Sequence, residues 1–170
     1  NGLPKYTFGF NFTLGYKGFD LSANFTGAAG FQIAQSYRDP SGSQGNYSHR
    51  ILGRWTGEGT SNEMPRVTYG DVGNWLFSDL YLQDGDYIRL QNLTLGYDFK
   101  KLISWKGLSK LRLYFQVQNL FTLTKYDGMD PEIGSYNGTD GNSSDSWVSG
   151  VDMGYYPHPR TFIVGVNVAF

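Results

Sequence analysis

The chain has 170 residues and a formal net charge of −1, with 14 Lys and Arg against 15 Asp and Glu. That balance argues against a polybasic nucleic-acid binder, because phosphate recognition needs clustered positive charge. The sequence contains no cysteine, which excludes disulfides, thiolate metal sites and cysteine nucleophiles. Charged residues reach 17%, aromatic residues also reach 17%, and glycine fills 23 positions. Such a composition is unlike a helical bundle or a disordered tail, and no apolar run is long enough for a transmembrane helix.

The first segment with a regular pattern is Tyr6–Tyr16, in which aromatic or leucine side chains alternate with small polar ones. A period of two predicts a β-strand with one apolar face. Lys17-Gly18 follows and predicts a two-residue hairpin turn. The turn would pair Tyr16 with Phe19, and the apolar face would continue along residues 19–33 of a second strand.

The middle of the chain, about residues 35–86, is polar and has no sustained period. Short strand-like pieces are expected at 66–69 and 75–82. A third strand follows over 87–99, but its apolar residues change parity at Gln91-Asn92. A change of parity within one strand predicts a β-bulge.

The rest of the chain contributes two more strands. A short connection over 100–110 leads to a fourth strand at 111–122, and a long polar segment over 125–160 leads to a fifth strand at 161–170. The connections are therefore short, long, short and long, with no convincing helix. In an up-and-down sheet, all the short turns would lie at one end and all the long loops at the other.

Four features distinguish a transmembrane sheet from a soluble sandwich. The first strand has the length that crosses a bilayer when tilted, which is about 9–11 residues. Tyrosines bracket that strand while Phe and Leu fill its middle, as expected for two aqueous interfaces around hydrocarbon. The connection lengths match short periplasmic turns and long external loops. The last strand stops on Phe170, like the barrel-assembly signal of outer-membrane strands. A soluble all-β domain is the alternative.

Five strands are too few for a closed single-chain barrel, which needs at least about 8 strands. An open sheet edge in lipid would leave backbone N–H and C=O groups without partners. Either other copies complete the barrel, or the sequence is the last part of a longer chain. The sequence starts at Asn1 without an initiator Met or a signal segment, which favours the second explanation.

Three stretches resemble a known family: DGDYIRLQNLTLGY at 84–97, NLFTLTKYDGMDPE at 119–132 and YPHPRTFIVGVNVAF at 156–170. Together they are similar to the carboxy-terminal end of the SusC/RagA family of TonB-linked outer-membrane transporters of Bacteroidetes. The resemblance implies an all-β fold in which residues 1–170 form about five antiparallel strands of a 22-stranded transmembrane barrel, closed by an amino-terminal plug. It places the chain in the bacterial outer membrane as a multi-pass β-barrel, assembled by the barrel-assembly machinery.

The function implied by the resemblance is nutrient import. A SusD-like surface lipoprotein would cover the external mouth, and the TonB–ExbB–ExbD complex would act on an amino-terminal part upstream of this sequence. The substrate would be an oligosaccharide or a peptide. Two alternatives stay open at this point, namely a passive porin-type barrel and a soluble carbohydrate-binding β-domain.

Aromatic residues in the two long polar segments are the candidates for contact with the substrate or the lid, because aromatic faces stack on sugars and on apolar peptide side chains. These candidates are Tyr126, Tyr136, Trp147, Tyr155, Tyr156, Trp55 and Trp75. Trp105, in a short connection, is expected to be an interfacial anchor.

Catalysis and metal binding have little support in the sequence. The two histidines, His49 and His158, belong to no recognisable catalytic motif, and no enzymatic activity or cofactor is expected. Residues 140–145 place oxygen ligands at alternate positions, but they lack the glycine and glutamate of a calcium loop. Asp127, Asp130 and Glu132 raise the same weak possibility, and a solvated polar loop is the favoured reading of both segments.

Overall fold

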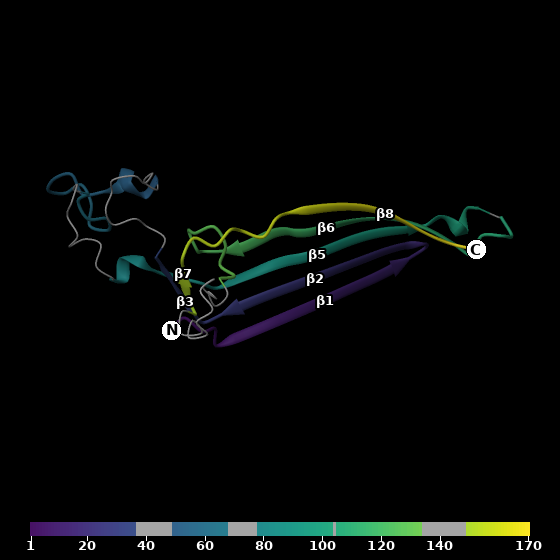
Figure 1. Cartoon of the computed structure of the whole chain (residues 1–170), viewed down its shortest axis with the longest axis horizontal. Coiled ribbons are helices and arrows are strands. Elements are labelled where there is room, and N and C mark those ends of the chain that lie inside the picture. Colours follow the sequence, from purple (N-terminus) through teal and green to yellow (C-terminus); the bar gives the residue numbers. More distant parts are fainter. Residues whose placement is uncertain (37–48, 68–77, 104, 134–148) are drawn as a thin grey trace, which may run out of the picture.

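The computed structural model describes residues 1–36, 49–67, 78–103, 105–133 and 149–170. Its main feature is a five-stranded sheet in the order β1-β2-β5-β6-β8, in which every neighbouring pair is antiparallel (Figure 1). The strands are β1 (Tyr6–Tyr16), β2 (Phe19–Ala29), β5 (Tyr87–Asp98), β6 (Lys110–Thr124) and β8 (Thr161–Ala169). The predicted all-β, antiparallel, up-and-down arrangement is confirmed.

The turn between β1 and β2 has the predicted form. Lys17 and Gly18 both adopt positive φ, at 48° and 98°. Two consecutive residues with positive φ are typical of the tight hairpin turn whose twist matches that of the strands. The turn pairs Tyr16 with Phe19, as expected, and fixes the register of the whole hairpin as far as Tyr6 opposite Ala29.

The second strand is shorter than predicted. β2 ends at Ala29, and Gly30 turns the chain at φ 78°, a conformation that side chains rarely tolerate. The Gly30 N–H donates to Asp86 Oδ1 at 2.6 Å, which fixes the turn. Ile33 therefore lies not on the outer stripe but in β3 (Gln32–Gln35), a strand of a second sheet. The apolar alternation alone carried no sign of this change of direction.

The predicted β-bulge is present at Gln91. Asn92 of β5 pairs with Gln118, whereas Leu90 pairs with Phe121, so the ladder shifts between these two positions. The same shift occurs towards β2, between Asn24 and Phe25. Because a bulge reverses the parity of the strand, the apolar residues on both sides of Gln91 can share one face.

The long segment between β3 and β5 differs in detail from the expectation. The expected pieces at 66–69 and 75–82 lie partly outside the described residues. Of their described parts, Arg66 and Val67 have no regular structure, and the second forms a 3₁₀ turn η3 (Asp79–Tyr81) that leads into β4 (Leu82–Asp84). Two other 3₁₀ turns are η1 (His49–Gly53) and η4 (Phe99–Lys101). Within the described ranges, none of the helices has the length and apolarity needed to cross a bilayer.

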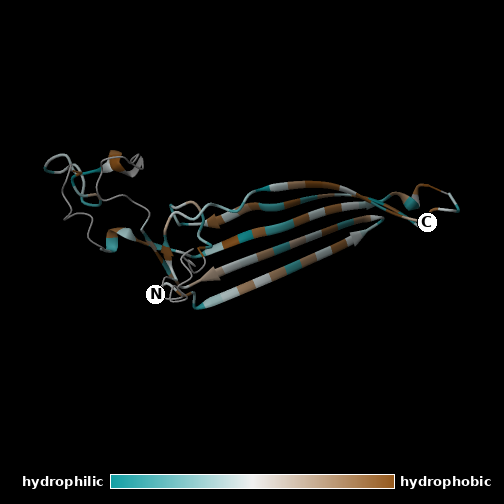
Figure 2. Cartoon of the chain, viewed as in Figure 1, coloured by the Kyte–Doolittle hydropathy of each residue, from teal (hydrophilic) through white to brown (hydrophobic). Residues whose placement is uncertain are grey.

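The two faces of the large sheet differ in polarity, and hydropathy alternates along each strand (Figure 2). One face, here called the outer face, carries Phe and Leu from β1 and Val and Phe from β8, and these side chains are exposed. Phe10 is 59% exposed and Phe162 is 61% exposed. The described residues therefore place no second sheet over this stripe, as a sandwich would require.

The connections confirm the predicted asymmetry. The β1–β2 turn and the β5–β6 connection lie at one end of the large sheet, with the carboxyl end of β8, and the long connections lie at the other end (Figure 1). At the long-connection end, β3 pairs with β4 and with β7 (Val151–Asp152) to form a small three-stranded sheet.

Candidate functional site at the long-connection end of the sheet

The small sheet of β3, β4 and β7, here called the loop platform, joins the two long connections. β3 runs antiparallel to β4 and parallel to β7. Ile33 of β3 is completely buried and packs in a cluster with Ala28, Phe31 and Tyr126. The platform thus gives both connections a common base beside the main sheet, and it contains the best-buried apolar side chain of the described chain.

Tyr126 and Asp152 fix the second long connection to this platform. The Tyr126 hydroxyl donates to Asp152 Oδ2 at 2.5 Å, and both residues are buried. The other carboxylate oxygen of Asp152 accepts the N–H groups of Gly154 and Tyr155, at 2.8 and 3.1 Å. One buried carboxylate therefore organises the backbone before the exposed tyrosines Tyr155 and Tyr156.

A second polar cluster lies where β5 meets the segment after β6. It is here called the Arg89 cluster and contains Arg89, Thr122, Asp130, Glu132 and His158. Arg89 is 2% exposed and forms ion pairs with Asp130 and, at 2.8 Å, with Glu132. Its Nε donates to Thr122 Oγ1 at 3.0 Å. A buried arginine with three oxygen partners satisfies most of its donors in one place.

Asp130 is the centre of the Arg89 cluster. One of its oxygens accepts the Glu132 N–H at 2.9 Å, and the other accepts the His158 N–H at 3.1 Å and lies 3.0 Å from His158 Nδ1. Burial acts to raise the pKa of this carboxyl, but the hydrogen bonds from Glu132 and His158 and the charge of Arg89 outweigh it and lower the pKa. Asp130 is therefore held as the anion and joins the segment after β6 to the one before β8.

The inner face of the large sheet carries another ion pair, near the short connections. Arg112 of β6 donates to both oxygens of Asp20 on β2, at 2.8 and 2.5 Å, across the intervening strand β5. The residue between them is Gly96, where a Cβ would lie 2.5 Å from Asp20 Oδ1. The alternation of β6 places Arg112 on the polar face, but nothing in the local sequence indicates Asp20 as its partner.

The predicted aromatic candidates fall into three groups. Tyr126 is buried in the platform, so that its ring supports the connection. Trp55 and Tyr155 are each 37% exposed and Tyr156 is 84% exposed, which leaves their rings able to contact a ligand. Tyr136, Trp147 and Trp75 lie outside the described residues.

Phe170 and Trp105 lie together at the short-connection end. Their rings make an edge-to-face contact, with 6.3 Å between centroids. Phe170 is 84% exposed and Trp105 is 61% exposed, so the pair has the position that an interfacial aromatic anchor needs. The role of Phe170 as an assembly signal stays a prediction.

Among the described residues, no three or more His, Asp or Glu side chains are grouped so that they could hold a metal ion. Asp130 and Glu132, weak calcium candidates from the sequence, bind Arg89 instead. The other candidate segment, 140–145, lies outside the described residues.

The sequence interpretation missed Arg89 and Asp152, and it considered Asp130 only as a weak calcium ligand. The sequence does contain an indication for Arg89. The bulge places Arg89 on the inner face among polar side chains, and a lone arginine in a strand needs an acidic partner. Which of the acidic residues downstream would be that partner depends on the path of the loop. The alternation of apolar and polar residues in the sequence does not determine that path.

Comparisons with known proteins agree with the geometry. No family model matches the chain. TonB-dependent receptor P3 of Formosa agariphila is 36% identical over 98% of this chain and 16% of its own length. Receptor P26 of the same organism is 31% identical over 99% and 17%. TonB-dependent receptor SusC of Bacteroides thetaiotaomicron is 29% identical over 91% and 14%.

Solved structures show the same fold. The RagAB peptide importer in its open-open state matches 99% of this chain and 17% of its own, with a TM-score of 0.72 and 24% identity. The RagAB peptide transporter matches 95% and 17%, with a TM-score of 0.71 and 25% identity. These relatives and neighbours are receptors and transporters. The chain spans about one sixth of the length of the curated relatives it matches. It belongs to the SusC/RagA family of TonB-dependent receptors.

Proposed function

We propose that this chain forms part of the wall and the outer loops of a TonB-dependent transporter that imports oligosaccharides or peptides across the bacterial outer membrane. The observation that carries the proposal is the large sheet, which has an exposed apolar outer face and a polar inner face. That distribution suits a wall between lipid and a wet or plugged lumen. Within the described residues, β1 and β8 each pair on one side only, and further strands of a 22-stranded barrel would complete the ladder.

The orientation follows from the connections. Outer-membrane barrels have short periplasmic turns and longer extracellular loops. The turn at Lys17-Gly18 would face the periplasm, and the loop platform and the Arg89 cluster would face the outside. In this orientation the two buried carboxylates, Asp130 and Asp152, hold the extracellular connections against the barrel mouth.

The proposed substrate class and the proposed partners are supported by the relationship to the family. RagAB is a peptide importer, which supports a peptide as substrate, and the likeness to SusC supports the SusD-like lipoprotein as lid. Coupling to TonB–ExbB–ExbD would involve the remainder of the receptor. The barrel-assembly machinery would insert the strands, with Phe170 in the signal. The passive porin and the soluble binding domain are not favoured, because the relatives are TonB-dependent receptors.

The exposed aromatic side chains of the outer connections are the proposed contacts to substrate or lid. Tyr155 and Tyr156 follow directly on the backbone that Asp152 holds, so that their placement is defined rather than left to a free loop. Trp55 contributes from the first long connection, and Tyr136, Trp147 and Trp75 remain proposed contacts. Tyr126 acts indirectly, through the platform.

Uptake by cells that depend on the full-length receptor tests this function. Deletion of the gene should abolish growth on a defined set of peptides or oligosaccharides, and deletion of TonB should have the same effect. Tyr156→Ala should lower uptake, whereas Tyr6→Ala, at a tyrosine on β1 that is also well exposed, should not. Uptake that persists without TonB would instead identify a passive barrel.

A further inference from the structure

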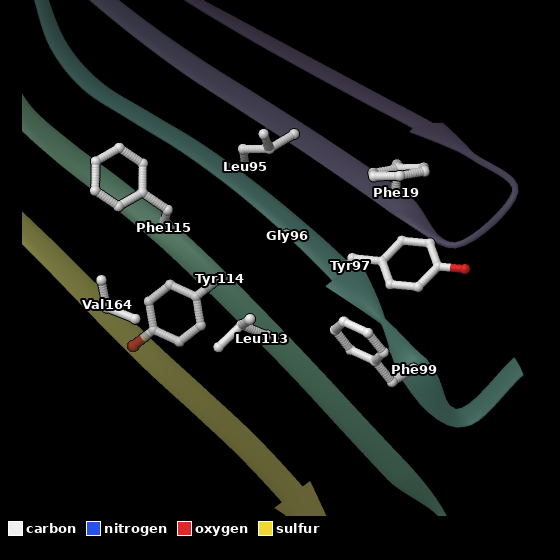
Figure 3. Close-up of a pocket in the computed structure, with 9 residues that line it drawn as sticks. All are labelled: Phe19, Leu95, Gly96, Tyr97, Phe99, Leu113, Tyr114, Phe115 and Val164. Carbon is white, nitrogen blue, oxygen red and sulfur yellow. The ribbon is translucent and has the colours of Figure 1, made fainter. Parts of the chain in front are cut away.

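The outer face of the large sheet is hollowed near the short connections, where β2, β5, β6 and β8 contribute side chains (Figure 3). The hollow has a volume of about 330 Å³. Leu95, Phe115 and Val164 stand on one side of it, and Phe19, Tyr97 and Phe99 stand on the other. Every one of these six side chains is apolar or aromatic, so the hollow suits a hydrocarbon chain.

The aromatic side of the hollow is a continuous row of rings. Phe19 and Tyr97 pair across the strands, with 4.4 Å between ring centroids, and Tyr97 meets Phe99 edge-to-face at 4.9 Å. The Tyr97 hydroxyl points away from the other lining side chains and towards the β1–β2 turn (Figure 3). Tyrosines orient in this way at a boundary between hydrocarbon and water. The row therefore marks where a lipid tail would give way to its headgroup.

Basic side chains flank this row of rings along the chain. Lys17, in the turn before Phe19, holds its ammonium group 5.2 Å from the Tyr16 ring. Lys100, which follows Phe99, donates to the Trp105 carbonyl at 2.8 Å. Lys106 lies in the same connection.

The acidic side chains of the strands that line the hollow lie on the other face of the sheet. Asp20 forms an ion pair with Arg112 on the inner face. Asp98 follows Tyr97 and pairs in register with Arg112, so strand alternation places it on the inner face as well, where its side chain accepts the backbone N–H of Lys100 at 2.9 Å. The charged side chains next to Phe19 and Phe99 along the chain are therefore Lys17 and Lys100, and their charge complements a phosphate.

We propose that this hollow binds an anionic phospholipid of the periplasmic leaflet, with an acyl chain along Leu95, Phe115 and Val164 and the phosphate beside Lys17 and Lys100. The inference rests on the proposed function, because it needs the outer face to lie in a membrane with the short connections in the periplasm. It adds a binding site for one class of lipid to an outer face that would otherwise contact acyl chains without selectivity.

Native mass spectrometry of the full-length receptor in detergent tests the site. Dioleoyl phosphatidylglycerol should bind more tightly than dioleoyl phosphatidylcholine, which has the same tails but no net charge. Glycerol phosphate alone should not compete, because it lacks the tails that fill the hollow. Equal binding of the two lipids would overturn the proposal, and so would displacement by glycerol phosphate.

Two kinds of variant locate the binding. Lys17→Gln together with Lys100→Gln should weaken phosphatidylglycerol binding roughly 25-fold, since each lysine near a membrane surface contributes about fivefold. Lys125→Gln, at the other end of β6, is the charge control and should bind as the wild type does. Leu113→Trp should fill the hollow and exclude the tail, whereas Leu14→Trp places the same ring on the outer face outside it.

The readouts separate this inference from the function of the receptor. Each variant is first checked for the heat-modifiable migration of a folded barrel, and the lysine variant still decides the matter if Leu113→Trp does not fold. Substrate import should persist in the lysine variant. A receptor that imports its substrate but binds phosphatidylglycerol equally well with and without Lys17 and Lys100 would overturn the lipid site alone.

Discussion

Arg89 and Asp130, which are 41 positions apart in the chain, form a buried ion pair that joins the wall of the sheet to the connection after β6. Their side chains are 3% and 6% exposed. A buried pair is stable only when its remaining donors and acceptors are also satisfied. Thr122, Glu132 and His158 meet that condition here, so the pair works as a fixed attachment point for the outer connection.

Replacement of Arg89 should release this attachment. Arg89→Ala leaves the Asp130 carboxylate buried without its cation, a change that costs about 3–5 kcal/mol in comparable buried pairs. We expect the free energy of local opening of residues 125–133, measured by amide hydrogen exchange in the full-length receptor, to fall by about that amount. Arg160→Ala, which removes an exposed arginine near the same connection, is the control. Exchange in Arg89→Ala that matches the wild type would show that the ion pair does not hold the loop.

The same attachment should weaken in strong acid. The pKa of Asp130 is lowered from its ordinary value of 3.8. The carboxylate thus contributes its full stabilisation above pH 3.8 and loses it only as the pH falls below that value, through the folded-state pKa. We expect the difference in local opening between the wild type and Asp130→Asn to persist at pH 5 and to shrink as the pH falls below 3.8 towards pH 2. A difference that already shrinks at pH 5 would contradict the lowered pKa.

The strands of the main sheet were predictable because their signals are local. The alternation in Tyr6–Tyr16, the turn at Lys17-Gly18 and the parity change at Gln91 each depend on a few neighbouring residues. Side chains on a strand have a fixed period of two, so an inserted residue shows directly in the sequence as a change of phase.

The loop platform and the Arg89 cluster could not be predicted in the same way. β3 and β7 pair across more than 100 residues of sequence, and β7 has only two residues, too few to show a period. The end of β2 depends on Gly30 meeting Asp86, which are 56 positions apart. Such contacts are fixed by the path of the chain between them, and the local pattern around each residue is compatible with several paths.

Removal of the Tyr126 hydroxyl should loosen the platform. Tyr126→Phe deletes one donor to a carboxylate that is 1% exposed, and hydrogen bonds to charged groups contribute about 1.5–3 kcal/mol. The Gly154 and Tyr155 amides still bind Asp152, which favours the lower part of that range. Hydrogen exchange at Gly154 and Tyr155 should rise accordingly, and Tyr156→Phe, at a site 84% exposed, should leave it unchanged. An equal effect of both substitutions would show that the buried hydroxyl has no special role.

The space at Gly96 should be needed for the ion pair on the inner face. A Cβ at this position would lie 2.5 Å from Asp20 Oδ1 and 2.6 Å from Arg112 Nε, so Gly96→Ala must push the two side chains apart. Because these are the ends of flexible side chains, the sheet should still form, and the cost should be about 1–3 kcal/mol, as for other overpacked sites. Gly9→Ala is the matched control, since its Cβ would meet only the Phe25 carbonyl, at 3.7 Å. The melting temperature of the full-length receptor should fall for Gly96→Ala and not for Gly9→Ala.

A double-variant background tests whether the space at Gly96 serves the ion pair. With Asp20→Asn and Arg112→Gln already in place, the charged pair is gone, and Gly96→Ala should lower the melting temperature less. An equal decrease in that background would show that the glycine is needed for the backbone rather than for the pair.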